Sequence, residues 1–233
     1  MAFQAQVLID RAARGLNDPS NSRWPIDELL EYISDAQRAT VLLRPEANPI
    51  IDTVKLVAGV RQTIPADGFT LLTITRNMGT DGTTPGPAIG SAARGDLDID
   101  RSWTTQDPAA VVANFNYDVR ARKTFYVSPP QPAAGQGQVE LIYSKVPDDI
   151  DSATDTMALD EIYIPTLHSY VMHCAFLKDM PVQGHTPEVA NLYFERFMTL
   201  LLGRADENES DIVVTQEVTT AQDRGSYGRG RRR

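Results

Sequence analysis

Residues 26–64 read IDELLEYISDAQRATVLLRPEANPIIDTVKLVAGVRQTI, and the spacing of the apolar residues changes within this stretch. In its first half, Ile, Leu, Ala and Val recur every three or four positions, which is typical of an amphipathic helix. We expect this helix over 25–43, with Pro25 at its first position and its end before Pro45. From Ile50 onwards apolar and polar residues alternate, and this period of two predicts strands. A chain that separates helices from strands in this way is expected to adopt an α+β fold.

Further helices are expected on both sides of the strands. Apolar residues spaced by four predict a helix over 3–15, and the segment PTLHSYVMHCAFLK predicts another over 165–178. A last helix is expected over 187–202, because a Thr-Pro pair begins it and a glycine follows its end. We predict that the two N-terminal and two C-terminal long helices pack as an antiparallel helical bundle, with a small antiparallel β lobe inserted at about 50–144.

The inserted lobe is predicted to consist of hairpins. Residues on either side of Gly59 are expected to pair with each other across a tight turn, and 111–117 is expected to pair with 124–127. FTLLTITR at 69–76 and VELIY near 140 read as further strands. Residues 77–96 contain five Gly and two Pro and hardly any apolar side chains, so we expect a long exposed loop there.

The charge is distributed unevenly along the 233 residues. The chain has 22 Lys and Arg against 31 Asp and Glu, a net charge of −9, yet residues 224–233 hold five arginines and no acid. Without those five arginines, 17 basic residues stand against 31 acidic ones, a net charge of −14 for residues 1–223. An acidic body disfavours general nucleic-acid binding by the folded part, because phosphate contacts need clustered Lys and Arg.

The sequence also indicates where the protein is made. No apolar run approaches the length of about 20 residues that a membrane-spanning helix needs. The first ten residues lack the basic and apolar regions of a signal peptide, so we expect synthesis in the cytoplasm and no membrane association. The single cysteine, Cys174, excludes an internal disulfide and a thiolate zinc site.

The residue types that carry catalysis are present without their usual spacing. His168 and His173 are five apart on the expected helix over 165–178, whereas zinc helices pair histidines four apart. Cys174 lies on the apolar side of that helix, as an inert core thiol does. Asp148, Asp149, Asp151 and Asp155 lack the order of a calcium-binding loop and read as a solvated linker. No glycine pattern predicts phosphate binding or a serine nucleophile. We therefore predict no catalytic residue, no metal ligand, no cofactor and no enzymatic activity.

Residues 204–233 have a different composition and are predicted to form an extended arm outside a folded domain of residues 1–203. IVVTQEV at 212–218 has β propensity, so we expect it to add to the edge of a partner's sheet. The five arginines have three possible roles: a solvated terminus, contact with an acidic protein surface, or contact with DNA phosphates. Tyr227, set among Gly and Arg, is similar to segments that stack on single strands.

Several stretches of the chain have a characteristic wording and order. In the N-terminal part they are RAARGLND at 11–18, Arg23-Trp24, ELLEYISDAQR at 28–38 and VLLRP at 41–45. The later stretches are VKLVAGVRQTIPADGFTLLTITRN at 54–77, FYVSPP at 125–130, VELIYSKVPDDI at 139–150 and ALDEIY at 158–163. In this order they resemble the head-to-tail adaptor (connector) proteins of short-tailed phages. The similarity covers about residues 5–203, and these motifs are structural rather than catalytic.

The resemblance implies a structural virion protein at the neck between the capsid and the tail. Members of this family form a homo-oligomeric ring, a dodecamer matched to the portal protein, and join the DNA-filled head to tail or nozzle proteins. The genome DNA would pass through the channel without specific binding, since an acidic lining does not attract phosphates. The C-terminal arm would then dock on the portal. The residues assigned to this docking are Ile212, Val213, Val214, Val218, Arg224, Tyr227, Arg229, Arg231, Arg232 and Arg233.

Two other functions remain open from the sequence. The chain could be a nucleic-acid-binding module that uses the Arg-rich tail, in which case salt-dependent DNA binding would be lost on removing 224–233. It could also be a hydrolase with an unrecognised site, in which case single Asp or Glu changes would abolish activity on peptidoglycan.

Overall fold

The computed structural model describes residues 3–99, 102–183 and 187–203, and these fall into two compact units. The first, here called the β unit, contains residues 34–151 and 155–160 together with Phe3. The second, here called the helical unit, contains residues 4–33, 152–154 and the described residues after 160.

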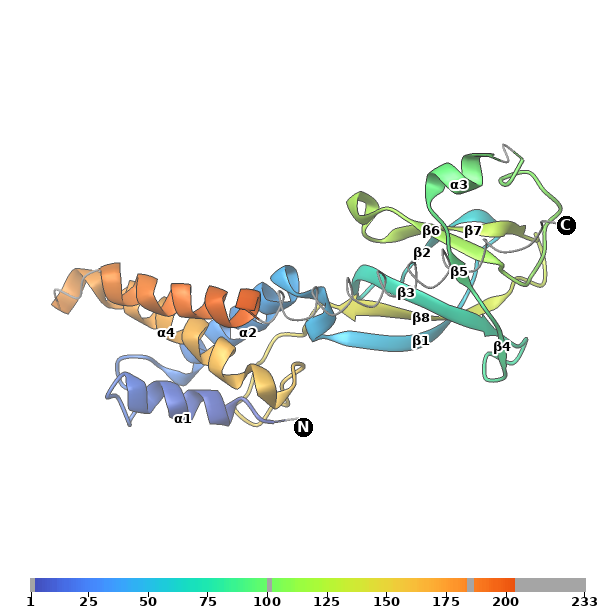
Figure 1. The fold of residues 1–233 in the computed structure, drawn as a ribbon. Helices are drawn as coiled ribbons and strands as arrows, with labels where there is room; N and C mark the ends of the chain where they lie inside the picture. Colours follow the sequence, from blue (N-terminus) through green and yellow to red (C-terminus); the bar gives the residue numbers. More distant parts are fainter. Residues whose placement is uncertain (1–2, 100–101, 184–186, 204–233) are drawn as a thin grey trace, which may run out of the picture. The chain divides into compact units, whose positions relative to one another are not determined.

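The strands of the β unit form two four-stranded sheets (Figure 1). One sheet has the order β1-β8-β3-β4 and is antiparallel throughout. The other has the order β2-β7-β6-β5, in which β5 pairs with β6 in parallel. The strands are β1 (Pro49–Lys55), β2 (Gly59–Thr63), β3 (Gly68–Met78), β4 (Pro85–Ala88), β5 (Gly90–Ser91), β6 (Asn114–Tyr117), β7 (Thr124–Gln131) and β8 (Gln138–Lys145). Short helices also occur in this unit: η1 (Pro45–Ala47), α3 (Arg94–Ile99) and η2 (Val119–Ala121).

Alternation of side chains explains why these segments form strands. In β8, Val139, Leu141 and Tyr143 are buried, and the residues between them are half-buried. In β7, Phe125 and Val127 are buried in the same way. These residues belong to one apolar cluster that takes side chains from both sheets. Burial of this shared face is the main force that holds the β unit together.

A buried amide side chain connects three segments of the β unit. Asn77, at the end of β3, donates hydrogen bonds from Nδ2 to the carbonyls of Pro87 (3.1 Å) and Val112 (2.8 Å). Its Oδ1 accepts the backbone N–H of Val112 at 2.7 Å. Because buried backbone groups need partners, this one residue satisfies polar groups of two segments that are remote in sequence.

The helical unit contains α1 (Gln6–Gly15), the first turns of α2 (Ile26–Leu43), η3 (Glu161–Tyr163) and α4 (Ile164–Gln183). Residues 187–203 form a further helix, orange-red in Figure 1. Helix α1 packs against α4, and a Cβ atom added at Gly15 would lie 3.0 Å from Met172 Cε. The aromatic rings of Tyr170 and Phe197 lie 5.1 Å apart, so α4 also contacts helix 187–203.

The structure corrects the predicted architecture. It has α-helices and two four-stranded sheets in the described residues, so the fold is α+β but is not an antiparallel bundle of four long helices with a small β lobe. One reason is that α1 has only ten residues. A second is that α2 is shared between the units, because its residues 34–43 belong to the β unit. There Ser34 Oγ accepts the N–H of Ile150 at 3.0 Å and Gln37 Oε1 accepts the N–H of Ala158 at 2.9 Å.

Two local predictions within the β unit are also wrong. The residues on either side of Gly59 do not pair with each other, because β1 pairs with β8 and β2 pairs with β7 in the other sheet. The Gln62 side chain fixes this crossover by accepting the N–H of Val57 and donating to the carbonyls of Val57 and Gly59. Residues 77–96 are not one exposed loop, since they contain β4, β5 and the start of α3. The predicted pairing of 111–117 with 124–127 is confirmed for residues 114–117, which form β6 and pair with residues 125–128 of β7.

Candidate functional site

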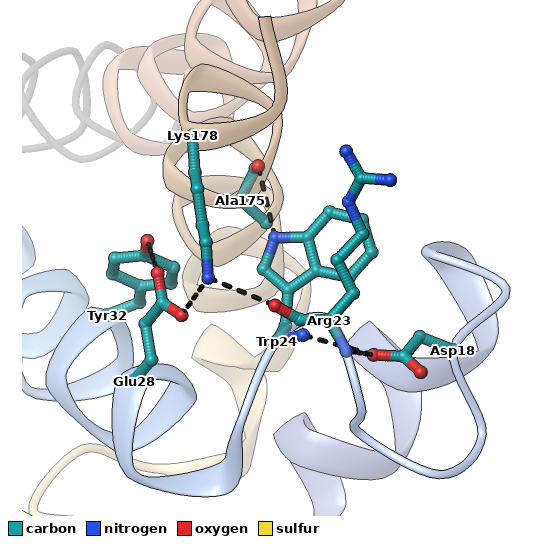
Figure 2. Close-up of polar contacts among 7 residues, drawn as sticks. All are labelled: Asp18, Arg23, Trp24, Glu28, Tyr32, Ala175 and Lys178. Carbon is teal, nitrogen blue, oxygen red and sulfur yellow. Dashed lines mark hydrogen bonds and ion pairs between the residues drawn. The ribbon is translucent and has the colours of Figure 1, made fainter. Parts of the chain in front are cut away.

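The predicted docking arm lies outside the described residues. This applies to the whole of 204–233 and therefore to Ile212, Val213, Val214, Val218, Arg224, Tyr227, Arg229, Arg231, Arg232 and Arg233. His185 also lies outside them. The candidate site that the structure does describe is a polar network in the helical unit, which fixes the loop 17–25 between α1 and α2 to α4 (Figure 2).

Trp24 is the apolar centre of this network. It directly precedes Pro25, whose carbonyl accepts the N–H of Leu29 at 3.1 Å and so begins α2. The Trp24 side chain is 4 % exposed, and its Nε1–H donates a hydrogen bond to the carbonyl of Ala175 at 3.2 Å. The indole therefore joins the start of α2 to α4 both by packing and by a polar contact.

Asp18 holds the shape of the loop. Its carboxylate accepts three backbone N–H groups, from Ser22 (3.0 Å), Arg23 (2.9 Å) and Trp24 (3.1 Å). These hydrogen bonds, that of Trp24 above all, keep the pKa of Asp18 below its ordinary value. Asn17 and Asn21 have positive φ angles of 54° and 50°, a conformation that Asn tolerates better than most residues do. Three neighbouring backbone donors of the loop thus share one acceptor, which defines the turn.

Lys178 of α4 binds the same loop from the other side. Its Nζ donates to the carbonyl of Arg23 at 3.0 Å and forms an ion pair with Glu28. Tyr32, one turn further along α2, donates its hydroxyl to Glu28 Oε1 at 2.5 Å. Figure 2 shows these side chains converging between α2 and α4.

The network also perturbs its acidic and phenolic groups. Burial acts to raise the pKa of Glu28, but the hydrogen bonds from Lys178 and Tyr32 outweigh burial, and the pKa lies below the ordinary value of a glutamate. Burial and the hydrogen bond to Glu28 raise the pKa of Tyr32. Glu28 therefore stays charged and Tyr32 stays neutral at physiological pH, so the network is held by a charged pair with a neutral donor.

The arrangement is suited to holding a surface rigid rather than to chemistry. The side chains of Asp18, Trp24, Glu28, Tyr32 and Lys178 all bind other groups of the protein. The Arg23 guanidinium carbon lies 5.3 Å from the centre of the Trp24 ring. A loop fixed in this way presents residues 17–25 in one conformation, which reduces the entropy that docking of a partner would cost.

The histidines and the cysteine singled out in the sequence are placed in packing roles. His173 Nδ1 lies 2.8 Å from the carbonyl of Ala190, and its ring is 5.0 Å from that of Phe194. Cys174 is half-buried. His168 lies on α4. Burial lowers the pKa of its imidazole, and the charges of Arg11, Arg196 and Arg14 lower it further, whereas a hydrogen bond with the backbone of Arg11 raises it.

The acidic stretch predicted as a solvated linker is exposed but makes specific contacts. Asp148 forms an ion pair with Lys145 at 3.0 Å, and Asp149 forms one with Arg38. Asp155 accepts the N–H of Asp151 at 3.0 Å. No group of three His, Cys, Asp or Glu that could hold a metal ion occurs in the part of the chain that the structure describes. Within that part, no helix is both long and apolar enough to span a membrane.

The anchoring role of Trp24 was not predicted from the sequence, in which Arg23-Trp24 only formed part of a family resemblance. The spacing between Trp24 and Leu29 at the start of α2 could have indicated this role. A large apolar residue just before a helix start, five residues before a buried Leu29, is typical of a hydrophobic staple. The contacts of Trp24 with Ala175 and of Lys178 with Arg23 join residues about 150 positions apart, and no local pattern predicts such pairs.

Comparison with known families adds an independent finding. Residues 4–224 match the model of a family described as SU10 adaptor protein. The match includes both units, with the network around Trp24, and extends through residues 204–224 of the arm. No curated protein matches the chain.

Proposed function

Because the chain belongs to the SU10 adaptor protein family of phages, and is thus a structural virion component, we propose that it joins the DNA-filled head to the tail as a ring docked on the portal. The observation that carries this proposal is the family match over 4–224, which includes nearly all of the described residues. A dodecamer would match the portal and leave a channel for the genome. The direct partners would be the portal protein, tail or nozzle proteins and further copies of the chain.

The charge of the chain supports passage of DNA without binding. The net charge of residues 1–223 is −14, so a channel lined by this body would repel phosphates rather than hold them. We propose no catalytic activity and no cofactor, since an adaptor acts by holding other proteins together. The neck of the virion is the location that follows from this role.

We further propose that residues 1–203 form the adaptor body and that 204–233 form the portal-docking arm. The family match extends through Ile212–Val218 and ends at Arg224, so the apolar part of the arm belongs to the region that defines the family. In this proposal the segment 212–218 adds a strand to the portal and the terminal arginines bind acidic portal residues.

Mass photometry tests this proposal. The full chain and a chain ending at residue 203 are each mixed with the purified portal ring. We expect one discrete, stoichiometric complex with the full chain and none with the shortened chain. A full-length variant with Arg224, Arg229, Arg231, Arg232 and Arg233 replaced by Gln separates the arginines from the apolar segment. Equal binding by the shortened chain would refute the arm, and absence of binding by the full chain would refute the adaptor role.

One observation favours a second function, namely the five arginines without any acid in 224–233. A nucleic-acid-binding module would use them to bind phosphates. Retention of duplex DNA at low salt, weakened by added salt and lost in the Gln variant, would support this alternative over the portal contact.

A further inference from the structure

A small basic surface lies on the helical unit of this acidic protein. Arg11 and Arg14 are exposed and one turn apart on α1, and Arg196 is exposed on helix 187–203. Beside burial, the charges of all three lower the pKa of His168 on α4, the helix that both of these helices pack against. These three arginines are here called the basic surface.

The packing of the helices explains why residues so remote in sequence meet. Ala12 and Ala13, between the two arginines of α1, are buried, and the Cβ position of Gly15 lies 3.9 Å from His168 Nε2. On the other side, Phe197 follows Arg196 and packs against Tyr170, two residues after His168. The two flanking helices therefore direct arginines to the same stretch of α4.

The arginines of the basic surface have no ion-pair partner among the described residues, although acidic residues outnumber basic ones in the chain. His168 Nε2 is buried and has no hydrogen-bond partner in the same part of the structure. Leu192, four residues before Arg196 and thus on the same side of its helix, is 63 % exposed. Arginine beside an exposed apolar residue is a composition typical of protein interfaces.

We propose that the basic surface binds acidic residues of a neighbouring copy of this chain, and so forms one half of the subunit contact in the ring. This inference rests on the proposed function, because it assigns a partner within the proposed ring. Two copies with a net charge of −9 each repel one another unless local charges of opposite sign meet. A head-to-tail ring brings two different surfaces of the same chain together, so a basic surface can meet an acidic one in every contact.

DNA is the less favoured partner. Only three cations contribute here, and the surrounding body is acidic, so the number of phosphate contacts is small and the repulsion is large. In the proposed ring, by contrast, every copy would have another acidic copy of the chain beside its basic surface.

Charge reversal on the full chain tests the proposal. The variant Arg11→Glu, Arg14→Glu, Arg196→Glu is mixed with the portal ring, and the occupancy of the portal is measured by mass photometry against protein concentration. A second variant with Gln at the same positions allows for the weakening of α1 that an acid near its last turn would cause. The control variant carries Glu at Arg61, Arg94 and Arg120 of the β unit, which gives the same net charge.

We expect the Glu variant to need about tenfold more protein to complete the ring, the Gln variant to need an intermediate concentration, and the control to behave as the wild type. Wild-type behaviour of the Glu and Gln variants would overturn the proposal and leave the adaptor role intact. An equal loss in the control would overturn it in favour of a general charge effect. The proposal would also be overturned if the wild type bound duplex DNA and the variant with Gln at positions 11, 14 and 196 did not. Failure of the wild type itself to bind the portal would instead refute the proposed function on which the inference rests.

Discussion

Replacing Trp24 gives the most quantitative test of the loop anchor. The Trp24 side chain is 4 % exposed and makes two kinds of contact, namely apolar packing and one hydrogen bond from Nε1–H to the Ala175 carbonyl. Truncation of a buried Trp to Ala costs about 3–5 kcal/mol. Trp24→Phe keeps most of the packing and loses the hydrogen bond, which contributes about 0.5–1.5 kcal/mol. With some loss of ring area, we expect Trp24→Phe to cost about 1–2 kcal/mol.

The assay is equilibrium urea unfolding followed by circular dichroism at the helix band. The chain has two tryptophans, Trp24 in the helical unit and Trp103 in the β unit, so fluorescence can assign each transition to its unit. In a Trp103→Phe background, the fluorescence of Trp24 alone reports the unfolding of the helical unit. Both replacements remove this fluorophore, so the unfolding of the variants is followed by circular dichroism, with the wild-type transition of the helical unit as the reference.

Either of two results would refute the anchoring role of Trp24. A cost below about 1 kcal/mol for Trp24→Ala would mean that the indole does not hold α2 to α4, because a well-packed buried Trp cannot be removed so cheaply. Equal costs for Trp24→Ala and Trp24→Phe would mean that the hydrogen bond, and not the packing, carries the whole effect.

Three further changes have expected outcomes. Asn77→Ala leaves the N–H and carbonyl of Val112 without their partner, so the free energy of unfolding of the β unit should fall by about 2–4 kcal/mol in urea titrations. Gly137→Ala should destabilise the β unit severely, because its Cβ would lie 2.0 Å from the backbone carbonyl oxygen of Ala110, and soluble yield with thermal melting checks this. NMR titration should give Asp18 a pKa below that of a free aspartate. The ionised carboxylate then stabilises the folded state fully above the pKa of about 3.9 that it has in the unfolded chain, and this stabilisation is lost as the pH falls through the lower pKa of the folded state. Asp18→Asn should remove this dependence of stability on acid pH.

The elements with regular spacing were predictable from the sequence. The helix expected over 25–43 is α2 (Ile26–Leu43), and the strand expected near VELIY is β8. The helix expected over 187–202 occupies residues 187–203. In these segments the buried face repeats at the period of a helix or a strand, so local pattern and tertiary packing agree.

The arrangement of those elements was not predictable in the same way. The strands on either side of Gly59 have the pattern of a hairpin, yet each finds its partner in a different sheet, because Gln62 and the shared core favour the crossover. Residues 77–96 have a loop's composition, but Asn77 binds the carbonyl of Pro87 within this segment and β4 pairs with β3. Likewise, the ion pair of Lys178 with Glu28 depends on the packing of α4 beside α2, which no local window contains.

The central claim is that this chain is the adaptor between head and tail, and a reconstruction of the neck of the phage particle that encodes it tests this most directly. The account predicts a ring of density between the portal and the tail, into which the β unit and the helical unit fit as separate bodies in every copy. Density for the chain at any other place in the particle, or a neck built without it, would contradict the account.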